Sequence, residues 1–523
     1  MAYTDFIAAI DLGSSHMVGM VGTKSPTGAL SIIAYEVENS ATCIRRGCVY
    51  NVEETANKIK RLILKLENKL GGARIGKVYV GIGGQSLRSI DHTVPRILGT
   101  DGVVTEEVIS GLYEECRNYH PDMLDVLAAV SPTYFLDDKP EPNPVGIPCT
   151  RIEARYKLIV GRPSLKRYVI NSIADRARIE IADIVVSPLA LADVVLTDNE
   201  KDLGCALIGF GAGVTTLTVY KAGQLVNLSV IPFGGHLITR DITSLHLVEA
   251  EAERVKLTYG SAQMEKDNDL SIQVSSADGM GLREIKLADL NNVIEARMKE
   301  ILENVYARLE ATGLINSLGA GIIITGGGAA LKNLPEVIRE RLKMDVRYSA
   351  VRKGIVESGE MIANNPEYAV AVGLLARGAI NCALYIPPKV DPIPEKKEEP
   401  VEEKKEENVI DIEAKPEITF DDFGKMQFQV GEIIACEEVK KSKKLLCSQV
   451  KIGSEVKQIV SGIKKHYSAE EMVGKKVMVL VNLKPAKLAG VLSEGMLLCA
   501  EDAEGNLALM TPEKNMPAGA EIC

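Results

Sequence analysis

A charged segment interrupted by prolines divides this sequence into two parts. Residues 389–417 hold 6 Lys and 11 Asp or Glu and have no aromatic residue. Such a segment buries too little apolar surface to offset the entropy lost on ordering. A solvated charged helix is the alternative, but four prolines interrupt it: Pro392, Pro394, Pro400 and Pro416. We therefore predict a flexible linker over residues 387–417 that joins two folded bodies.

The overall composition is that of a globular protein in a reducing compartment. The chain has 523 residues, is 46% hydrophobic and carries a formal net charge of −10. This charge disfavours bulk binding of nucleic acid or of anionic membrane, although a local basic patch could still do either. The ten cysteines form no CxxC pair and have no regular spacing, which predicts neither a zinc site nor a disulfide framework. No signal peptide or membrane-length apolar run is evident, so we expect a cytoplasmic protein.

The larger body repeats one pattern of strands and helices. "FIAAIDLG" and "HMVGMVGT" read as two short strands around a turn, and a helix with an apolar stripe follows over "EETANKIKRLILKLENKLGG". The pattern returns with a hairpin at 207–220 and a helix around "LVEAEAERVKLTYG". We predict a duplicated α/β unit with a ligand cleft between its halves. An insert rich in Pro and Gly, from about residue 84 to 162, interrupts the first copy.

Three glycine-bearing segments are the candidate ligand loops: "AIDLGSSHMVG", "IGFGAGVTTL" and "IIITGGGAALKNLP". Glycines let backbone N–H groups approach phosphate oxygens, and an acid at a strand end, here Asp11, can hold Mg²⁺ through water. One such loop is more often a plain turn. Three in this order, with Glu253 and Lys256 one helical turn apart, favour a nucleotide cleft. That pair alone would be a surface salt bridge.

The second of these segments contains no carboxylate. Loops that hydrolyse nucleotides usually pair their glycines with an acid that positions Mg²⁺ or water. "LIGFGAGVTTLTVY" contains glycines and threonines but no Asp or Glu. We therefore predict that this loop holds phosphate without promoting hydrolysis, so that the chain is at most a very slow ATPase.

The order of these segments resembles the actin, sugar-kinase and DnaK-chaperone superfamily, and within it bacterial FtsA over about residues 5–380. The most specific stretches are "NPVGIPCTRIEARYKLIVG" and "SVIPFGGHLITRDI". The resemblance implies an α/β, actin-like (ribonuclease-H-like duplicated) fold. Its first half would be residues 1–83 with 163–200, its FtsA-type inserted subdomain 84–162, and its second half 201–386. It also implies ATP and Mg²⁺ in the cleft, self-association into a filament or dimer, and recruitment of FtsZ at the division site.

The resemblance also implies roles for individual residues. Asp11 would hold Mg²⁺ through water, and Glu253 with Lys256 would reach the ribose or the adenine edge. Phosphates and adenosine would contact the glycine loops, namely Gly13, Ser14, Ser15, His16, Gly211, Ala212, Gly213, Val214, Gly326, Gly327 and Gly328. The chain departs from the family pattern D-I-G-G-G-T-T-D, because Gly209 and Thr216 stand at its two acids.

The smaller body, residues 418–523, is a series of short apolar strands separated by Gly and Lys turns, which favours a small β-barrel. The block "FGKMQFQVGEI…KKVMVLVNLKPAKLAGVLSEGMLLCA" resembles the tRNA-binding OB-fold appended to bacterial methionyl-tRNA synthetases. That resemblance implies a tRNA partner and an RNA face that contains Lys444, Asn482, Ser493 and Met496.

Our main functional prediction is an ATP-binding, actin-like scaffold of cell division with an appended tRNA-binding-type OB domain. Two alternatives remain open. One is an ATPase or kinase of the same superfamily, for which we find no convincing catalytic base. The other is an RNA-binding protein with a passenger actin-like body. Membrane attachment is doubtful, because the linker is net acidic and the family's amphipathic anchor is not recognisable in this sequence.

Overall fold

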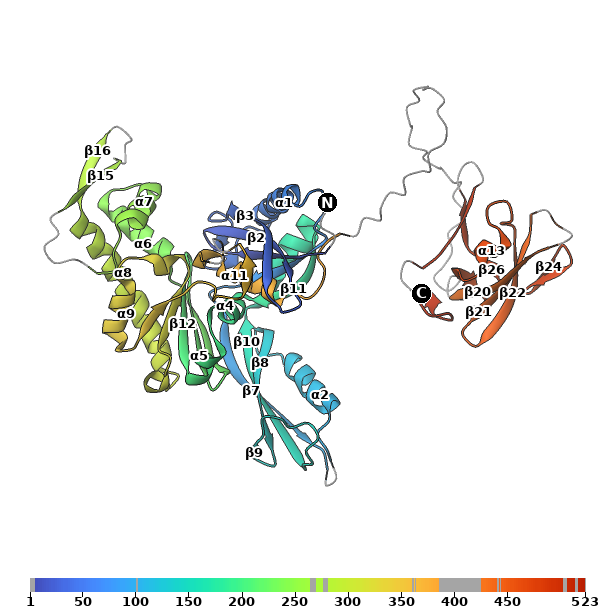
Figure 1. Ribbon diagram of the computed structural model, residues 1–523, viewed down its shortest axis with the longest axis horizontal. Helices are drawn as coiled ribbons and strands as arrows, with labels where there is room; N and C mark the ends of the chain where they lie inside the picture. Colours follow the sequence, from blue (N-terminus) through green and yellow to red (C-terminus); the bar gives the residue numbers. More distant parts are fainter. Residues whose placement is uncertain are drawn as a thin grey trace. The chain divides into compact units, whose positions relative to one another are not determined.

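The structure is a computed structural model of the chain, and its residues fall into two compact units, 1–390 and 391–523 (Figure 1). Each unit is described by itself. The described residues are 5–99, 102–263, 270–275, 281–359, 362, 364–384, 425–439, 442, 444–501, 506–512 and 516–522. The predicted linker, residues 387–417, therefore lies entirely outside the described residues.

The first sheet of the larger unit has six strands. Its order is β11 (Glu180–Val186), β6 (Lys77–Ile82), β1 (Ile7–Leu12), β2 (His16–Lys24), β3 (Leu30–Asn39), β19 (Val356–Ser358). β1 pairs antiparallel with β2 and parallel with β6, so the chain crosses over between them through α1 (Val52–Lys69). The Asn51 side chain caps α1 by accepting from Glu54 N. The apolar stripe of α1 is buried, as its spacing predicts.

The second sheet repeats this arrangement and has nine strands. Its order is β18 (Val346–Tyr348), β17 (Ile322–Thr325), β12 (Cys205–Phe210), β13 (Thr215–Lys221), β14 (Gln224–Ile231), β7 (Arg88–Ile97), β10 (Arg151–Gly161), β8 (Asp125–Leu136), β9 (Lys139–Pro140). β12 pairs antiparallel with β13 and parallel with β17, as β1 does with β2 and β6. The predicted duplication of the α/β unit is confirmed.

Helices around this second half complete its core, together with the short hairpin of β15 and β16 (Figure 1). They are α6 (Gly235–Ile242), α7 (Glu249–Tyr259), α8 (Leu287–Glu310) and α9 (Leu334–Leu342), with β15 (Ser271–Ser275) and β16 (Leu282–Lys286). The buried face of α8 runs from Leu290 to Leu309 and joins one apolar cluster with β12, β13 and β17.

The insert comprises β7, α2 (Glu106–Arg117), β8, β9 and β10. Although it interrupts the first half in sequence, Arg88 of β7 pairs with Ser229 of β14. The inserted strands therefore extend the sheet of the second half, a placement that the sequence did not predict. The insert also has an apolar cluster of its own, to which Leu112, Ile152 and Leu158 belong.

Two helices cross in the larger unit, α4 (Ser187–Val195) and α11 (Ala369–Arg377). A Cβ placed on Gly373 would lie 2.2 Å from the Ala190 carbonyl oxygen, so the two backbones touch at this point. Most of α11 is buried, as predicted for a core helix. Among the described residues, no helix is long and apolar enough to span a membrane.

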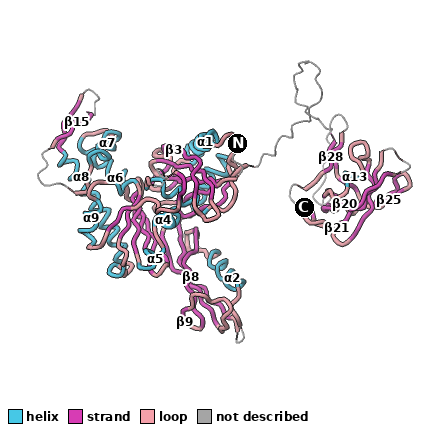
Figure 2. Tube along the Cα trace, in the orientation of Figure 1, coloured by secondary structure: helices cyan, strands magenta, loops and turns pink. Residues whose placement is uncertain are grey.

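The smaller unit consists almost entirely of strands (Figure 2). Its main sheet runs β22 (Glu455–Ser461), β21 (Leu446–Ile452), β20 (Phe428–Glu438), β23 (Lys476–Leu480), β26 (Met496–Leu497), with β29 (Glu521–Ile522) also pairing with β20. Two short hairpins are formed by β24 (Ala486–Leu488) with β25 (Val491–Ser493) and by β27 (Cys499–Glu501) with β28 (Leu507–Leu509). One short helix, α13 (Ala469–Met472), accompanies them. The predicted all-β class of this unit is confirmed.

Candidate functional site

A cavity of about 370 Å³ lies in the larger unit and is lined from both of its halves. All three glycine-bearing segments reach it. The predicted cleft residues that line it are Asp11, Gly13, Ser14, Ser15, His16, Gly211, Ala212, Gly213, Val214, Glu253, Lys256, Gly326, Gly327 and Gly328. The structure therefore brings together every cleft residue that the sequence singled out. What they bind remains a proposal.

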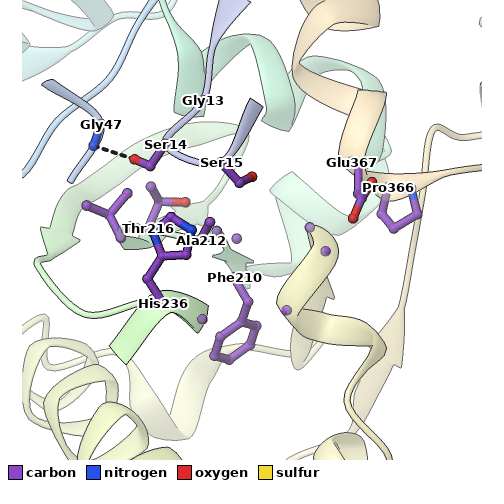
Figure 3. A pocket seen from close by; sticks show the side chains of 18 of the residues that line it. Gly13, Ser14, Ser15, Gly47, Phe210, Ala212, Thr216, His236, Pro366 and Glu367 are labelled. Carbon is purple, nitrogen blue, oxygen red and sulfur yellow. Dashed lines mark hydrogen bonds between the residues drawn. The ribbon is translucent and has the colours of Figure 1, made fainter. Parts of the chain in front are cut away.

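The first loop follows β1 and is tied to a neighbouring hairpin. Ser14 is buried, and its Oγ accepts a hydrogen bond from Gly47 N at 2.8 Å (Figure 3). Gly47 is the turn between β4 (Ile44–Arg45) and β5 (Cys48–Val49). The Ser15 hydroxyl lies 2.9 Å from His16 Nδ1. Both serines thus line the cavity, and the hydroxyl of each already has a partner in the protein.

Asp11 is the acid of the first loop. Burial raises the pKa of its carboxyl to about 7, and the hydrogen bond from the Leu12 backbone opposes this only in part. A Cβ on Gly81 would lie 3.3 Å from Asp11 Oδ1 and 2.6 Å from Ser187 Oγ. The absence of a side chain at Gly81 thus leaves room beside both polar groups, and Ser187 also lines the cavity.

We expect Asp11→Asn to stabilise the protein without ligand at high pH. A raised folded-state pKa means that the folded state binds more protons than the unfolded state between about pH 4 and pH 7, so the free energy of unfolding falls as pH rises through this window. The variant should therefore melt higher than the unaltered protein at pH 8, with a smaller difference at pH 4. Thermal unfolding across pH measures this, with the exposed Asp5→Asn as the control. Equal pH dependence of both proteins would contradict it.

The second loop, between β12 and β13, presents backbone and hydroxyl groups. Gly211 N donates to Val214 O, and His236 N, in the first turn of α6, donates to Ala212 O. Gly209 and Thr216 face each other across the hairpin, and a Cβ on Gly209 would lie 2.6 Å from Thr216 Oγ1. The threonine side chain thus occupies the space that a larger residue at 209 would need. The acids among the residues that line the cavity are Asp11, Glu253 and Glu367, none of which belongs to this loop.

The third group of side chains comes from α6 and α7. Lys256 Nζ donates to Glu253 Oε2 at 2.7 Å, to Thr239 Oγ1 at 2.8 Å and to Gly235 O at 3.2 Å. Thr239 also donates to Glu253. Glu253 and Lys256 therefore form, with Thr239, one hydrogen-bonded cluster at the cavity wall. This cluster fixes the position of the Glu253 carboxylate.

Several residues that line the cavity were not predicted as site residues. They are His236, Ser187, Glu367, Gly47, Gly83, Gly84, Lys332 and Phe210. His236 follows the double glycine 234–235, which was the one signal that could have identified it. Burial lowers the pKa of its imidazole. Phe210 and Lys332 lie within two of the quoted glycine segments, whereas Ser187, Glu367, Gly47, Gly83 and Gly84 lie outside all three.

The cavity suits a phosphate-bearing ligand with a hydrated cation. Backbone N–H groups at glycine turns and serine hydroxyls are typical phosphate donors, and both kinds of group line this cavity. Within the described ranges, no group of three His, Cys, Asp or Glu could hold a metal by itself. Mg²⁺ commonly keeps several waters and takes one or two carboxylates plus phosphate oxygens. A single carboxylate, Asp11, fits that mode of binding.

Of the four residues predicted to face RNA in the smaller unit, three are exposed and one is buried. Lys444 is exposed and Met496 is 53% exposed. Asn482 is exposed, but its side chain accepts from Gln427 N and donates to Lys425 O. Ser493 is 6% exposed; its hydroxyl accepts from Val460 N and donates to Gly495 O. Placing Ser493 on an RNA-contacting face was therefore a mistake, because its hydroxyl joins two strands inside the unit.

We expect Ser493→Ala to destabilise the smaller unit by about 1–3 kcal/mol, because it leaves the buried Val460 N–H without a partner. Lys444→Ala, at an exposed side chain, should change the free energy of unfolding by less than about 0.5 kcal/mol. Chemical denaturation of the full chain, followed in its smaller unit, tests both. Unchanged stability of Ser493→Ala would mean that the Ser493 hydroxyl does not stabilise the smaller unit.

Comparisons with known proteins agree with this architecture. Residues 206–373 match the family model of cell division protein FtsA, and residues 428–521 match the model of a tRNA binding domain. Cell division protein FtsA of Porphyromonas gingivalis is 35% identical over 381 residues, covering 72% of this chain and 79% of that protein. FtsA of Escherichia coli K12 is 26% identical over 389 residues, covering 71% and 90%.

Among solved structures, a chain of the PilM-PilN type IV pilus biogenesis complex superposes with a TM-score of 0.50 at 18% identity, over 71% of this chain and 98% of that one. At this identity the likeness concerns the fold alone, and it agrees with the actin-like fold expected from the sequence. Identity above 30% across most of both sequences is sufficient to assign the family. The chain belongs to the FtsA family, with an actin-like larger unit and a tRNA-binding-type domain at its C-terminal side.

Proposed function

We propose that this protein is a nucleotide-dependent scaffold of cell division that binds Mg-ATP in the cleft of its larger unit. One observation carries the proposal: three glycine loops from both halves, together with Asp11, line a single cavity. A ligand held by both halves stabilises the arrangement in which they are close, so binding shifts the population toward that shape. The scaffold would therefore be controlled by occupancy of the cleft.

Each part of the cavity has a role in this proposal. The turns at Gly13 and Gly211–Val214 would offer backbone N–H groups to the phosphates, and Asp11 would hold Mg²⁺ through water. The bound cation would neutralise phosphate charge. Glu253, already positioned by Lys256 and Thr239, would accept from the ribose hydroxyls. The segment Gly326–Gly328 would lie beneath the base.

Displacement of a fluorescent ATP analogue tests this step. We expect binding with Mg²⁺ that weakens when EDTA is added, and weakens further in Asp11→Asn. The control is Asp5→Asn, which lies outside the cavity. A protein that is folded by thermal unfolding and yet binds no analogue would refute nucleotide control.

FtsZ recruitment and self-association are the proposed outputs. They are supported by membership of the family whose relatives are named cell division protein FtsA. Pull-down of purified FtsZ, with and without ATP, separates a division scaffold from a metabolic kinase of the same fold. Sedimentation of the protein alone measures self-association. If FtsZ is retained only with ATP, or the protein sediments only with ATP, then occupancy of the cleft controls FtsZ binding or self-association.

Binding of tRNA by the smaller unit is a second candidate function, supported by the domain match over 428–521. A few lysines would supply the affinity, so binding should be modest and should weaken as salt rises. We expect Lys444→Ala and Lys487→Ala, both exposed, each to reduce the salt dependence by about one counterion. Lys475→Ala is the matched control, because Lys475 pairs with Glu471 at 2.7 Å. Equal effects of all three would locate the RNA face elsewhere.

We also propose that this protein acts at the division site on the inner face of the membrane and is brought there by a partner. The acidic character of residues 389–417 would disfavour contact with anionic lipid. Co-sedimentation of the full chain with anionic liposomes tests this. Robust ATP-dependent pelleting without a partner would show that the protein carries its own anchor.

A further inference from the structure

Glu367 is a charged side chain of the cavity that the proposed function leaves without a role. It lies in η5 (Pro366–Tyr368), directly before α11, and it lines the cavity. Its backbone N–H donates to Asn365 Oδ1 at 3.0 Å, which caps this turn. Figure 3 shows its side chain next to Pro366, and its Oε1 lies close to Gly327. The turn therefore holds an acid against one particular wall of the cavity.

The glycine segment has two different sides. A Cβ on Gly326 or on Gly328 would meet Phe210, at 2.6 Å and 3.0 Å respectively. A Cβ on Gly327 would instead lie 2.7 Å from Glu367 Oε1. The two outer glycines thus pack on β12, while the middle one adjoins the carboxylate. A flat group resting on this segment would have Glu367 at its edge.

The carboxylate of Glu367 is available to a ligand. Within the part of the chain that is described, Glu367 forms no ion pair and its carboxylate accepts no hydrogen bond. Glu253, the other acid on this side, already accepts from Lys256 and Thr239 through Oε2. An ionised carboxylate can only accept hydrogen bonds. Glu367 therefore suits a ligand group that donates an N–H and does not suit one that presents only an oxygen.

We propose that Glu367 determines base specificity, by accepting a hydrogen bond from the exocyclic amino group of a 6-aminopurine and disfavouring a 6-oxopurine. This inference rests on the proposed function, since it requires the base to lie on the segment Gly326–Gly328. A 6-oxo oxygen at the same place would face the carboxylate without a hydrogen between them. A site that positions an acceptor discriminates against a ligand that lacks the donor, because polar groups are then left unpaired.

The test compares ATP with inosine triphosphate, which carries an oxygen in place of the 6-amino group. Kd values come from displacement of one fluorescent nucleotide in the full-length protein with Mg²⁺. For the unaltered protein we expect ATP to bind about tenfold more tightly than inosine triphosphate. This ratio corresponds to a weak hydrogen bond to a charged group, because Glu367 is exposed to water. Glu367→Gln should reduce the ratio to about 1–3, because an amide can accept from the amino group or donate to the oxo group.

The matched control is Glu357→Gln in β19, an exposed acid outside the cavity. It makes the same change of net charge and should keep the ratio of the unaltered protein. An unchanged ratio in Glu367→Gln would overturn the inference while leaving nucleotide binding intact. Tighter binding of GTP than of ATP would also overturn it, because the carboxylate would then read the guanine edge. Failure of every nucleotide to bind a folded protein would refute the proposed function itself.

Discussion

Replacing Gly373 by leucine is expected to prevent stable folding of the larger unit. The new Cβ would lie 2.2 Å from the oxygen and 2.6 Å from the carbonyl carbon of Ala190. These are backbone atoms of a buried helix, so no side-chain rotation relieves the clash, and α4 and α11 would have to separate. Forcing extra atoms into a packed core usually costs about 1–3 kcal/mol. A clash between two backbones should reach or exceed the top of that range, against a typical net stability of about 5–15 kcal/mol.

The comparison is with Gly281→Leu in the same unit, where no atom lies within 4 Å of the added Cβ. That variant should express and melt like the unaltered protein. Soluble yield and the denaturation midpoint of the larger unit measure both effects. If the two leucine variants melted alike, the close crossing of α4 and α11 would not be a structural requirement.

If ATP binds as proposed, its hydrolysis is expected to be slower by about 10²–10⁴-fold than in ordinary ATPases. The reason is the second loop, where Gly209 and Thr216 provide no carboxylate to orient an attacking water. Phosphate release in the steady state should therefore fall well below about 1 per second. Release at that rate or faster would refute the prediction that this loop holds phosphate without promoting hydrolysis.

A carboxylate added at this position should raise the rate. Thr216 lines the cavity, so Thr216→Asp places an acid on the second loop without adding a residue to the turn. We expect faster phosphate release from Thr216→Asp than from the unaltered protein, with ATP still bound. Thr258→Asp, at an exposed position of α7, controls for the added charge. Equal rates in all three proteins would mean that an acid at 216 does not limit hydrolysis.

Local sequence patterns were sufficient for most of the fold. Glycine turns after apolar strands predicted the hairpins β1–β2 and β12–β13, and helical spacing predicted α1 with its buried stripe. These features depend on residues close together in the chain, through backbone conformation and the periodicity of side chains. The same locality made the three glycine loops visible, since each loop is one continuous segment.

The failures concern groups whose environment is set by distant residues. Ser493 was predicted to contact RNA, but its hydroxyl accepts from Val460 N and so joins the hairpin of β24 and β25 to β22 of the main sheet. Nothing in the residues next to Ser493 indicates that partner. Glu367 carried no signal either, because its relation to Gly327 joins segments 40 positions apart.

Local patterns alone indicated a segment too charged and too rich in proline to form a core, a larger body that is a duplicated α/β unit, and a second glycine loop that lacks an acid. The tertiary structure, in contrast, showed that the inserted strands extend the sheet of the second half, through Arg88 and Ser229. It also decided that Gly373 is a contact between two helices and that Glu367 faces the glycine segment. The physical reason is the same throughout: periodicity and turn chemistry act over a few residues, whereas packing and hydrogen bonding between remote segments depend on how the whole chain closes.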